Sequence, residues 1–130
     1  MSAAFVIDGG AIVDIPSLYA ELNRVFMADE DWAIGESLDA LDDLLYGGYG
    51  ALAGRDPVTV VWRQMDASRA ALGVDATRAW LQRKLARPGV FATTSIQRQL
   101  DALDQGTGRT YFDIVAEVFA SHPAIRLVAA

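Results

Sequence analysis

Short apolar runs alternate with amphipathic stretches along the whole chain. Three of the runs combine high β propensity with polar or turn-forming residues at their borders, which is typical of strands; they cover residues 3–8, 58–62 and 124–128. The middle run, VTVVW, is almost continuously apolar, so we expect a strand that is buried on both faces of a sheet. Strands separated by helices predict an α/β fold with a small three-stranded parallel sheet and right-handed crossovers.

Apolar residues at helical spacing predict the helices between these strands. The first helix begins at Ile15, takes Ser17 as its cap and ends near residue 27. The second covers residues 38–46, with Ser37 as its N-cap and a pair of glycines at its end. Further helices are expected over residues 65–72, 75–86, 93–105 and 110–121.

Charge is strongly segregated along the sequence, which carries a net charge of −6. Residues 1–50 contain ten acidic side chains and one basic one, a net charge of −9. Residues 63–98 contain seven basic and two acidic side chains, a net charge of +5. Such a dipolar molecule attracts cationic partners to its acidic half and repels bare nucleic acid there, although a merely solvated surface gives the same counts.

The basic stretch over residues 75–86 has two interpretations. It contains enough cations to contact RNA or the acidic half of the chain itself. The spacing of Trp80, Leu81 and Leu85 favours a packed amphipathic helix with these three side chains facing inward.

Composition excludes several functional classes. The chain has no cysteine, so it has no disulfide, no thiolate nucleophile and no cysteine-ligated zinc site. No apolar run approaches the roughly 20 residues of a membrane span, and the first ten residues resemble neither a signal nor a transit peptide. We therefore expect a cytoplasmic protein with one domain over residues 1–130 and with no cofactor or metal.

An acidic segment surrounds the second predicted helix. Residues 29–43 contain seven acidic side chains and no basic one. Asp39 and Asp43 are four residues apart and share a helix face, where like charges cost about 0.2–0.5 kcal/mol. Asp39 lies in the first turn, where the helix dipole favours it, but Asp43 has no such help. The repelling pair indicates a positively charged ligand, and the alternative is an ordinary solvated face.

The residues around this helix resemble the barstar family of ribonuclease inhibitors. The likeness is carried by EDWAIGESLDALDDLLYGG (residues 30–48) and by VTVVWRQMDASRAAL (residues 58–72). The first strand and helix and the last helix and strand fit as well, so the resemblance covers residues 4–72 and 110–130. It implies a barstar-like fold in which residues 73–109 form a helical insertion.

The resemblance also implies which residues contact a partner. The two key aspartates of the family's binding helix fall on Asp39 and Asp43, and a glutamate of the last helix falls on Glu117. The other implied contact residues are Trp32, Asp42, Tyr46, Gly47 and Tyr49. Asp42 departs from the family pattern, which has tryptophan there, and Gly48 replaces a second tryptophan, with Tyr49 one place along.

The function implied by this resemblance is inhibition of a basic, barnase-like ribonuclease or a related toxin nuclease. Carboxylates on a rigid helix can take the positions of RNA phosphates among the enzyme's cations. The implied partner is the ribonuclease alone, with no nucleic acid or membrane, and we expect the inhibitor to be a monomer when free. The altered aromatic positions leave a second hypothesis open, a barstar-like regulatory module whose target is not a ribonuclease.

An enzyme is the weakest of the hypotheses. Asp39 and Asp43 supply two carboxylates, which glycoside hydrolysis requires, but side chains one turn apart on one helix rarely straddle a scissile bond. His122 is the single histidine and precedes Pro123 at a helix end, so we expect a surface or capping residue rather than a base or a ligand. The sequence therefore predicts a binding protein without catalytic residues.

Overall fold

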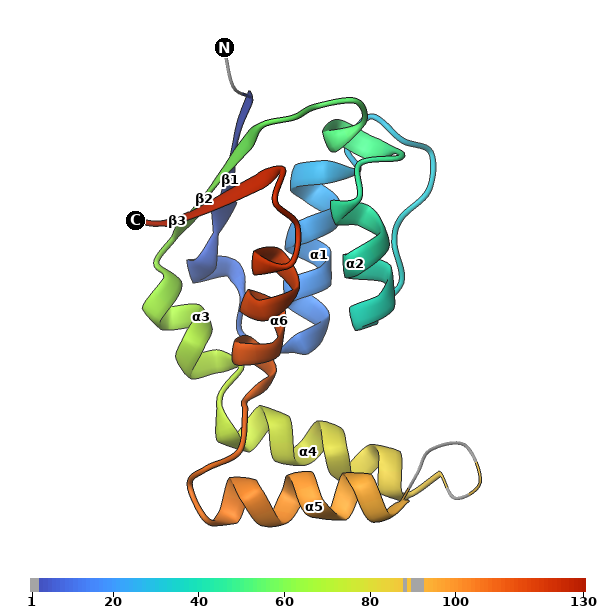
Figure 1. Cartoon of the computed structure of the whole chain (residues 1–130), viewed down its shortest axis with the longest axis vertical. Coiled ribbons are helices and arrows are strands. Elements are labelled where there is room, and N and C mark those ends of the chain that lie inside the picture. Colours follow the sequence, from blue (N-terminus) through green and yellow to red (C-terminus); the bar gives the residue numbers. More distant parts are fainter. Residues whose placement is uncertain (1–2, 88, 90–92) are drawn as a thin grey trace.

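A small parallel sheet organises the fold. The computed structural model describes residues 3–87, 89 and 93–130. Within this part of the chain the sheet has three strands, β1 (Ala3–Asp8), β2 (Val58–Arg63) and β3 (Ile125–Ala129). Both pairings are parallel and β2 lies in the centre (Figure 1). The predicted α/β class with a three-stranded parallel sheet is confirmed.

The helices of this region fall within one residue of the predicted bounds. They are α1 (Ile15–Phe26), α2 (Leu38–Leu45), α3 (Met65–Ala71), α4 (Val74–Leu85), α5 (Thr93–Asp104) and α6 (Tyr111–Ala120). Two 3-10 turns, η1 (Gly9–Ala11) and η2 (Gly50–Leu52), follow β1 and α2. Helices α1, α2 and α6 stand together beside the sheet, and α4 and α5 lie side by side beneath them (Figure 1).

Only one face of the sheet is fully covered. The side chains of Val58, Val60 and Trp62 are buried against the helices, whereas Thr59 and Val61 on the opposite face are partly exposed. The expectation that residues 58–62 are buried on both faces is therefore wrong. Valine favours strands even where burial is incomplete, so an apolar run overstates how much of the strand is covered.

The cap of α1 also differs from the prediction. Asp14, not Ser17, is the N-cap, because its Oδ1 accepts a hydrogen bond from Ser17 N at 2.8 Å. The hydroxyl Oγ of Ser17 in turn accepts from Asp14 N at 3.0 Å, which completes a reciprocal capping box. The first turn of the helix tolerates Pro16, because proline has no N–H that would need a partner there. The helix therefore begins before Ser17.

The α4–α5 hairpin has a small core of its own. Leu81 of α4 is buried against α5, whose inward side chains are Ile96, Leu100 and Leu103. Trp80 packs against this cluster and also against the main core, and Leu85 packs against the smaller one. The prediction that Trp80, Leu81 and Leu85 face inward is confirmed.

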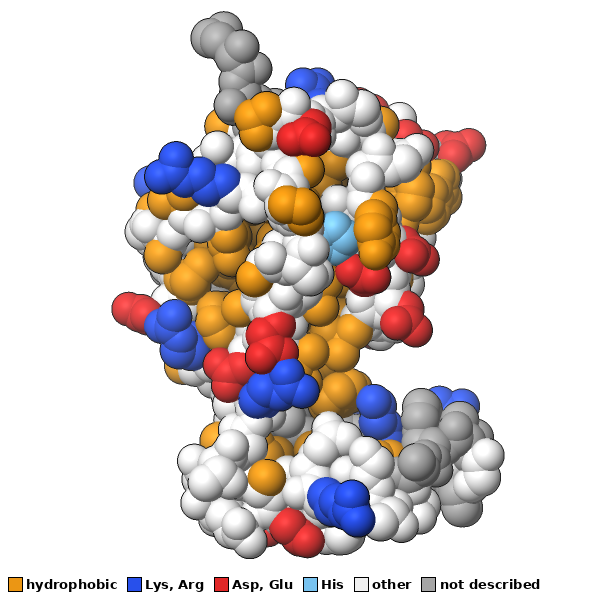
Figure 2. Space-filling model, in the orientation of Figure 1, with side chains coloured by type: hydrophobic (Ala, Val, Ile, Leu, Met, Phe, Trp, Pro, Cys, Tyr) orange, Lys and Arg blue, Asp and Glu red, His pale blue; other side chains and the backbone are white. Residues whose placement is uncertain are grey.

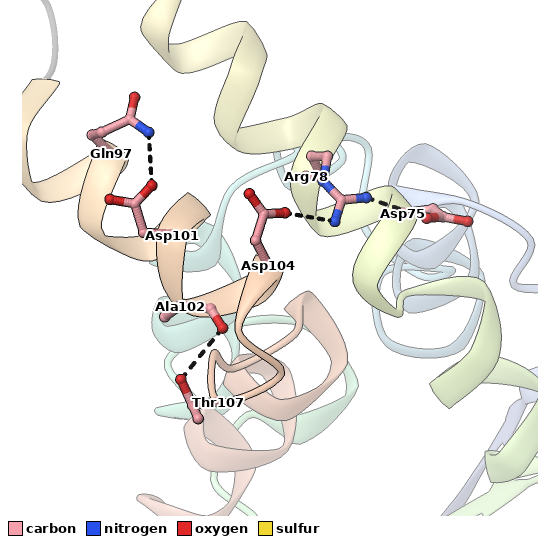
Figure 3. A network of polar contacts seen from close by, with 7 residues as sticks. All are labelled: Asp75, Arg78, Gln97, Asp101, Ala102, Asp104 and Thr107. Atoms are coloured by element: carbon pink, nitrogen blue, oxygen red, sulfur yellow. Dashed lines mark hydrogen bonds and ion pairs between the residues drawn. The ribbon is translucent and has the colours of Figure 1, made fainter.

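Polar contacts fix the base of the hairpin, near the turn that leads to α6 (Figure 3). Arg78 lies between two carboxylates, with Nη2 3.0 Å from Asp104 Oδ1 and Nη1 3.5 Å from Asp75 Oδ1. Beyond α5, Thr107 Oγ1 donates to the carbonyl oxygen of Ala102 at 3.3 Å. The hairpin is therefore joined to itself by polar contacts and to the main core by an aromatic side chain.

Candidate functional site

The approach loop to α2, residues 28–36, follows a fixed path despite its many charges. Asn23 of α1 binds the backbone of Ile34 twice: its Oδ1 accepts from Ile34 N at 2.8 Å, and its Nδ2 donates to Ile34 O at 3.3 Å. The Ile34 side chain is buried in the main core. Glu30 Oε1 accepts from Gly50 N at 3.4 Å, which ties the loop to η2.

Helix α2 is capped at both ends and buried on one face. Ser37 Oγ accepts from Ala40 N at 3.1 Å, as the sequence predicted. The helix ends before Gly47, whose φ of +77° favours glycine and where a Cβ would lie 3.0 Å from Leu52 O. The buried face consists of Leu41, Leu44 and Leu45. These contacts hold the opposite, polar face of α2 toward solvent.

Asp39 and Asp43 lie on that exposed face. Within the described part of the chain, neither carboxylate makes an ion pair or a side-chain hydrogen bond. Acidic side chains gather on the right of the upper body in Figure 2, where Figure 1 places α2 and the approach loop. Two neighbouring carboxylates on a rigid helix can each accept hydrogen bonds from a cationic partner.

Aromatic side chains border one end of α2. The rings of Trp32 and Tyr49 are in tilted contact, with centroids 4.7 Å apart. Trp32 remains 46% exposed and Tyr46 is 73% exposed, so both offer apolar area to a partner. Burial and then the charge of Asp43 raise the pKa of Tyr49, which keeps its phenol protonated and able to donate.

Asp42 points to another part of the protein. His122 Nε2 lies 2.7 Å from Asp42 Oδ1, and the imidazole also contacts the Tyr46 ring edge-on, with centroids 4.6 Å apart. His122 is only 5% exposed, so the expectation of a surface residue is wrong. The histidine is buried because α2 covers the turn that follows α6, a contact between segments 80 residues apart in sequence.

Glu117 lies on α6, which packs against α2. Its carboxylate forms an ion pair with Arg109, and both side chains are more than half exposed. The structure therefore places Asp39, Asp43 and Glu117 on two adjacent helices. Of these three carboxylates, only that of Glu117 has a cationic partner within the described residues.

A comparison with protein families decides where this chain belongs. The family model for Barstar (barnase inhibitor) matches residues 2–87, more than half of the chain. The chain belongs to the barstar family. The match includes the approach loop, α2 and both exposed aspartates. No curated protein matches the sequence.

Membership of the barstar family makes this chain a non-enzymatic protein of the inhibitor type. The match ends between α4 and α5, so the first part of the predicted insertion over residues 73–109 lies inside it. Helix α6 and strand β3 lie outside the match. The role of Glu117, which rests on the resemblance of residues 110–130, therefore stays a prediction.

In the ranges that the structure describes, no group of three or more histidine, aspartate or glutamate side chains is arranged to hold a metal ion. Among the helices of those ranges, none is long and apolar enough to cross a membrane.

Sequence reasoning missed three contacts that shape the surface. The bond from His122 to Asp42 joins segments 80 residues apart, and the ion pair from Arg109 to Glu117 joins the loop before α6 to that helix. The Asn23 contact with the approach loop could have been suspected, because a polar residue interrupts an apolar helix face there.

Proposed function

We propose that the chain inhibits a barnase-like ribonuclease, or a related toxin nuclease, by laying α2 across the enzyme's active-site cleft. Asp39 and Asp43 carry this proposal, because they are exposed carboxylates that no described cation neutralises. In the cleft they take the positions of two substrate phosphates and accept charge-assisted hydrogen bonds from the enzyme's cations. Membership of the barstar family supports the same function, inhibition of a ribonuclease.

Rigidity of the acidic face supports tight binding. The Ser37 cap, the buried leucines and the Asn23 contact with the approach loop fix α2 before any partner arrives. Little conformational entropy is then lost on association, which leaves more of the interaction free energy as affinity. The binding surface of the inhibitor is therefore formed before the enzyme binds.

The remaining contact residues surround the two aspartates. In this proposal the rings of Trp32, Tyr46 and Tyr49 bury apolar area at the edge of the interface, and Gly47 lets the enzyme approach the end of α2 closely. Asp42 serves with one carboxylate oxygen only, because the other binds His122. Glu117 contributes from α6 when its ion pair with Arg109 is replaced by a contact with a cation of the enzyme.

We also propose that the inhibitor acts in the cytoplasm, as a monomer with one domain. Trp80 supports the single domain, because it packs against both hydrophobic clusters.

Inhibition of purified barnase tests the proposal directly. RNA cleavage should fall to zero at a near one-to-one ratio of inhibitor to enzyme, and the Asp39→Ala/Asp43→Ala variant should need a large excess. The matched control is Asp66→Ala/Asp101→Ala, which removes two exposed carboxylates from α3 and α5 and should inhibit like the wild type.

Three results would overturn it. Hydrolysis of a substrate by the pure chain, lost in the Asp39→Ala/Asp43→Ala variant, would make it an enzyme. Equal inhibition by both double variants would remove α2 from the interface. Capture of a different protein through α2, without inhibition of any ribonuclease, would favour the regulatory module.

A further inference from the structure

A groove of about 640 Å³ separates the beginning of α2 from the hairpin helix α4. One wall carries Glu36 and Asp39, and the other carries Arg83, Lys84 and Arg87. Figure 2 shows the indentation between the upper body and the hairpin, with basic side chains on the hairpin side. Asp39, one of the two proposed docking carboxylates, therefore forms the edge of a groove whose far wall is cationic.

Aromatic rings form the floor between these walls. Trp80 and Tyr111 line the groove and pack edge to face, with ring centroids 4.8 Å apart. Lys84 Nζ lies 3.9 Å from the centre of the Trp80 ring, so this cation has a fixed position. Burial lowers the pKa of Lys84 in this setting. The floor thus offers a partner both apolar area and a positioned charge.

Cations at the end of α4 carry the sign opposite to that of the acidic helix. Arg83 lies in the last turn of α4 and Arg87 follows four residues later, just beyond the end of the helix; both are exposed, as Asp39 and Asp43 are on α2. Arg83 makes no ion pair with any side chain that the structure describes. The dipole at the C-terminal end of α4 stabilises cations, but it does not require them to face a groove that begins at Asp39.

We propose that this groove is a second docking subsite, which takes an acidic segment of the same partner ribonuclease whose cationic cleft receives α2. The proposal rests on the proposed function for the identity of the partner. Arg83 is its central residue, because a guanidinium binds a carboxylate through two parallel hydrogen bonds. A partner group that reaches Asp39 already lies at the mouth of the groove, so both contacts belong to one continuous interface.

Charge favours a protein segment over a nucleic acid in this groove. A polynucleotide carries a negative charge at every residue and would place phosphates against Glu36 and Asp39. A protein surface can instead alternate its signs, with a cation toward Asp39 and a carboxylate toward Arg83. This pattern of signs selects ribonucleases that carry an acidic rim beside the cleft, because the wrong sign places like charges together.

Titration of the full-length chain with small probes tests the subsite without a ribonuclease. We would follow the three tryptophan indole N–H signals by NMR while adding a capped tetraglutamate, a capped tetraglutamine or a tetrauridylate. Tetraglutamate should shift the Trp80 signal, with a dissociation constant in the millimolar range that a few exposed contacts give. The signal of Trp62, whose Nε1 donates to the buried Ser68 at 2.9 Å, should stay unchanged.

A pair of matched variants separates a local contact from a change of net charge. Arg83→Glu and Arg98→Glu change the charge equally, but Arg98 lies on α5 and does not line the groove. Only Arg83→Glu should abolish the tetraglutamate shift. With barnase as the protein probe, Arg83→Glu should raise the dissociation constant at least about tenfold, and Arg98→Glu should change it less than about twofold.

Each result bears on the proposal. No shift of Trp80 by tetraglutamate, or an equal shift by tetraglutamine or tetrauridylate, would overturn the acidic subsite. Tighter barnase binding by Arg83→Glu, or equal effects of Arg83→Glu and Arg98→Glu, would also overturn it. Wild-type chain that binds tetraglutamate at Trp80 but does not bind any ribonuclease would contradict the proposed function and leave the subsite standing.

Discussion

His122 Nε2 lies 2.7 Å from Asp42 Oδ1, and this bond joins the acidic helix α2 to the turn between α6 and β3. An ionised carboxylate only accepts hydrogen bonds, so the imidazole N–H donates. The contact is nearly closed to water on the histidine side, where the side chain is 6% exposed. It therefore sets the orientation of α2 relative to α6, the two helices that carry the proposed contact carboxylates.

Removal of this bond should loosen α2. We expect His122→Leu to lower the free energy of unfolding by about 1–3 kcal/mol, because a hydrogen bond to a carboxylate is lost. Asp42→Asn keeps an acceptor for the imidazole and should cost less. Urea unfolding measures both values. Equal stability of His122→Leu and the wild type would mean that the bond contributes nothing to the fold.

Asp43 and Asp42 should differ sharply as contacts for the ribonuclease. We expect Asp43→Ala to weaken barnase binding by about 2 kcal/mol or more, as truncation of a central interface residue does. Asp42→Ala should weaken it less, because that carboxylate is bound to His122. Titration calorimetry gives the two affinities, and circular dichroism checks that both variants are folded. Comparable losses would mean that the centre of the interface lies elsewhere.

Association should depend on salt much more than dissociation does. Screening shortens the reach of the acidic field to roughly 8 Å at physiological ionic strength, so the rate of encounter with a basic cleft should fall as salt rises. Asp29→Asn/Asp31→Asn should slow association and leave dissociation nearly unchanged. Glu30 is left intact because it accepts a hydrogen bond from Gly50 N. Stopped-flow mixing with barnase at several salt concentrations measures both rates, and an association rate indifferent to salt would exclude steering.

Glu21 should make the fold sensitive to acid. Burial alone would raise the pKa of this carboxyl, but hydrogen bonds from Arg24 and from Asp8 N outweigh it and hold the pKa below its usual range. The charged form therefore stabilises the folded state above the unfolded pKa of about 4.3, and this stabilisation is lost as pH falls through the lower folded pKa.

The matched variant for this prediction is Glu21→Gln, which keeps an acceptor for Asp8 N but cannot ionise. Urea unfolding at pH 7 and at pH 3 should show a stability difference from the wild type that shrinks in acid. A difference that stays constant with pH would show that the Glu21 charge does not contribute.

Trp80 should couple the hairpin to the rest of the protein. It is the aromatic side chain that packs against both hydrophobic clusters, so the wild type should unfold in a single transition. Trp80→Ala should destabilise the chain by less than the roughly 3–5 kcal/mol of a fully buried tryptophan, because Trp80 is only partly buried, and should expose the amides of α4 and α5 to hydrogen exchange before those of α1. Uniform exchange across both regions in the variant would contradict this coupling.

The sequence by itself determined the elements and the character of the acidic helix. Apolar periodicity depends on which side chains a helix or strand must bury, so the helix bounds and the alternation of strands and helices could be read along the chain. The two motifs over residues 30–48 and 58–72 indicated the family. The spacing of Asp39 and Asp43 placed these two residues together on one helix face. All of these properties are local in sequence.

Tertiary structure alone decided how the surface around α2 is completed. Asp42 has the same local pattern as Asp43, yet it binds His122 because α6 ends beside α2. Arg83 faces Asp39 across a groove because the hairpin packs against the main core through Trp80 and is tied to α6 by the hydrogen bond from Tyr111 N to Thr77 Oγ1. The uncovered face of β2 likewise depends on where the helices pack. Contacts between distant segments arise from packing, and no periodicity along the chain indicates which distant side chain will contact a given residue.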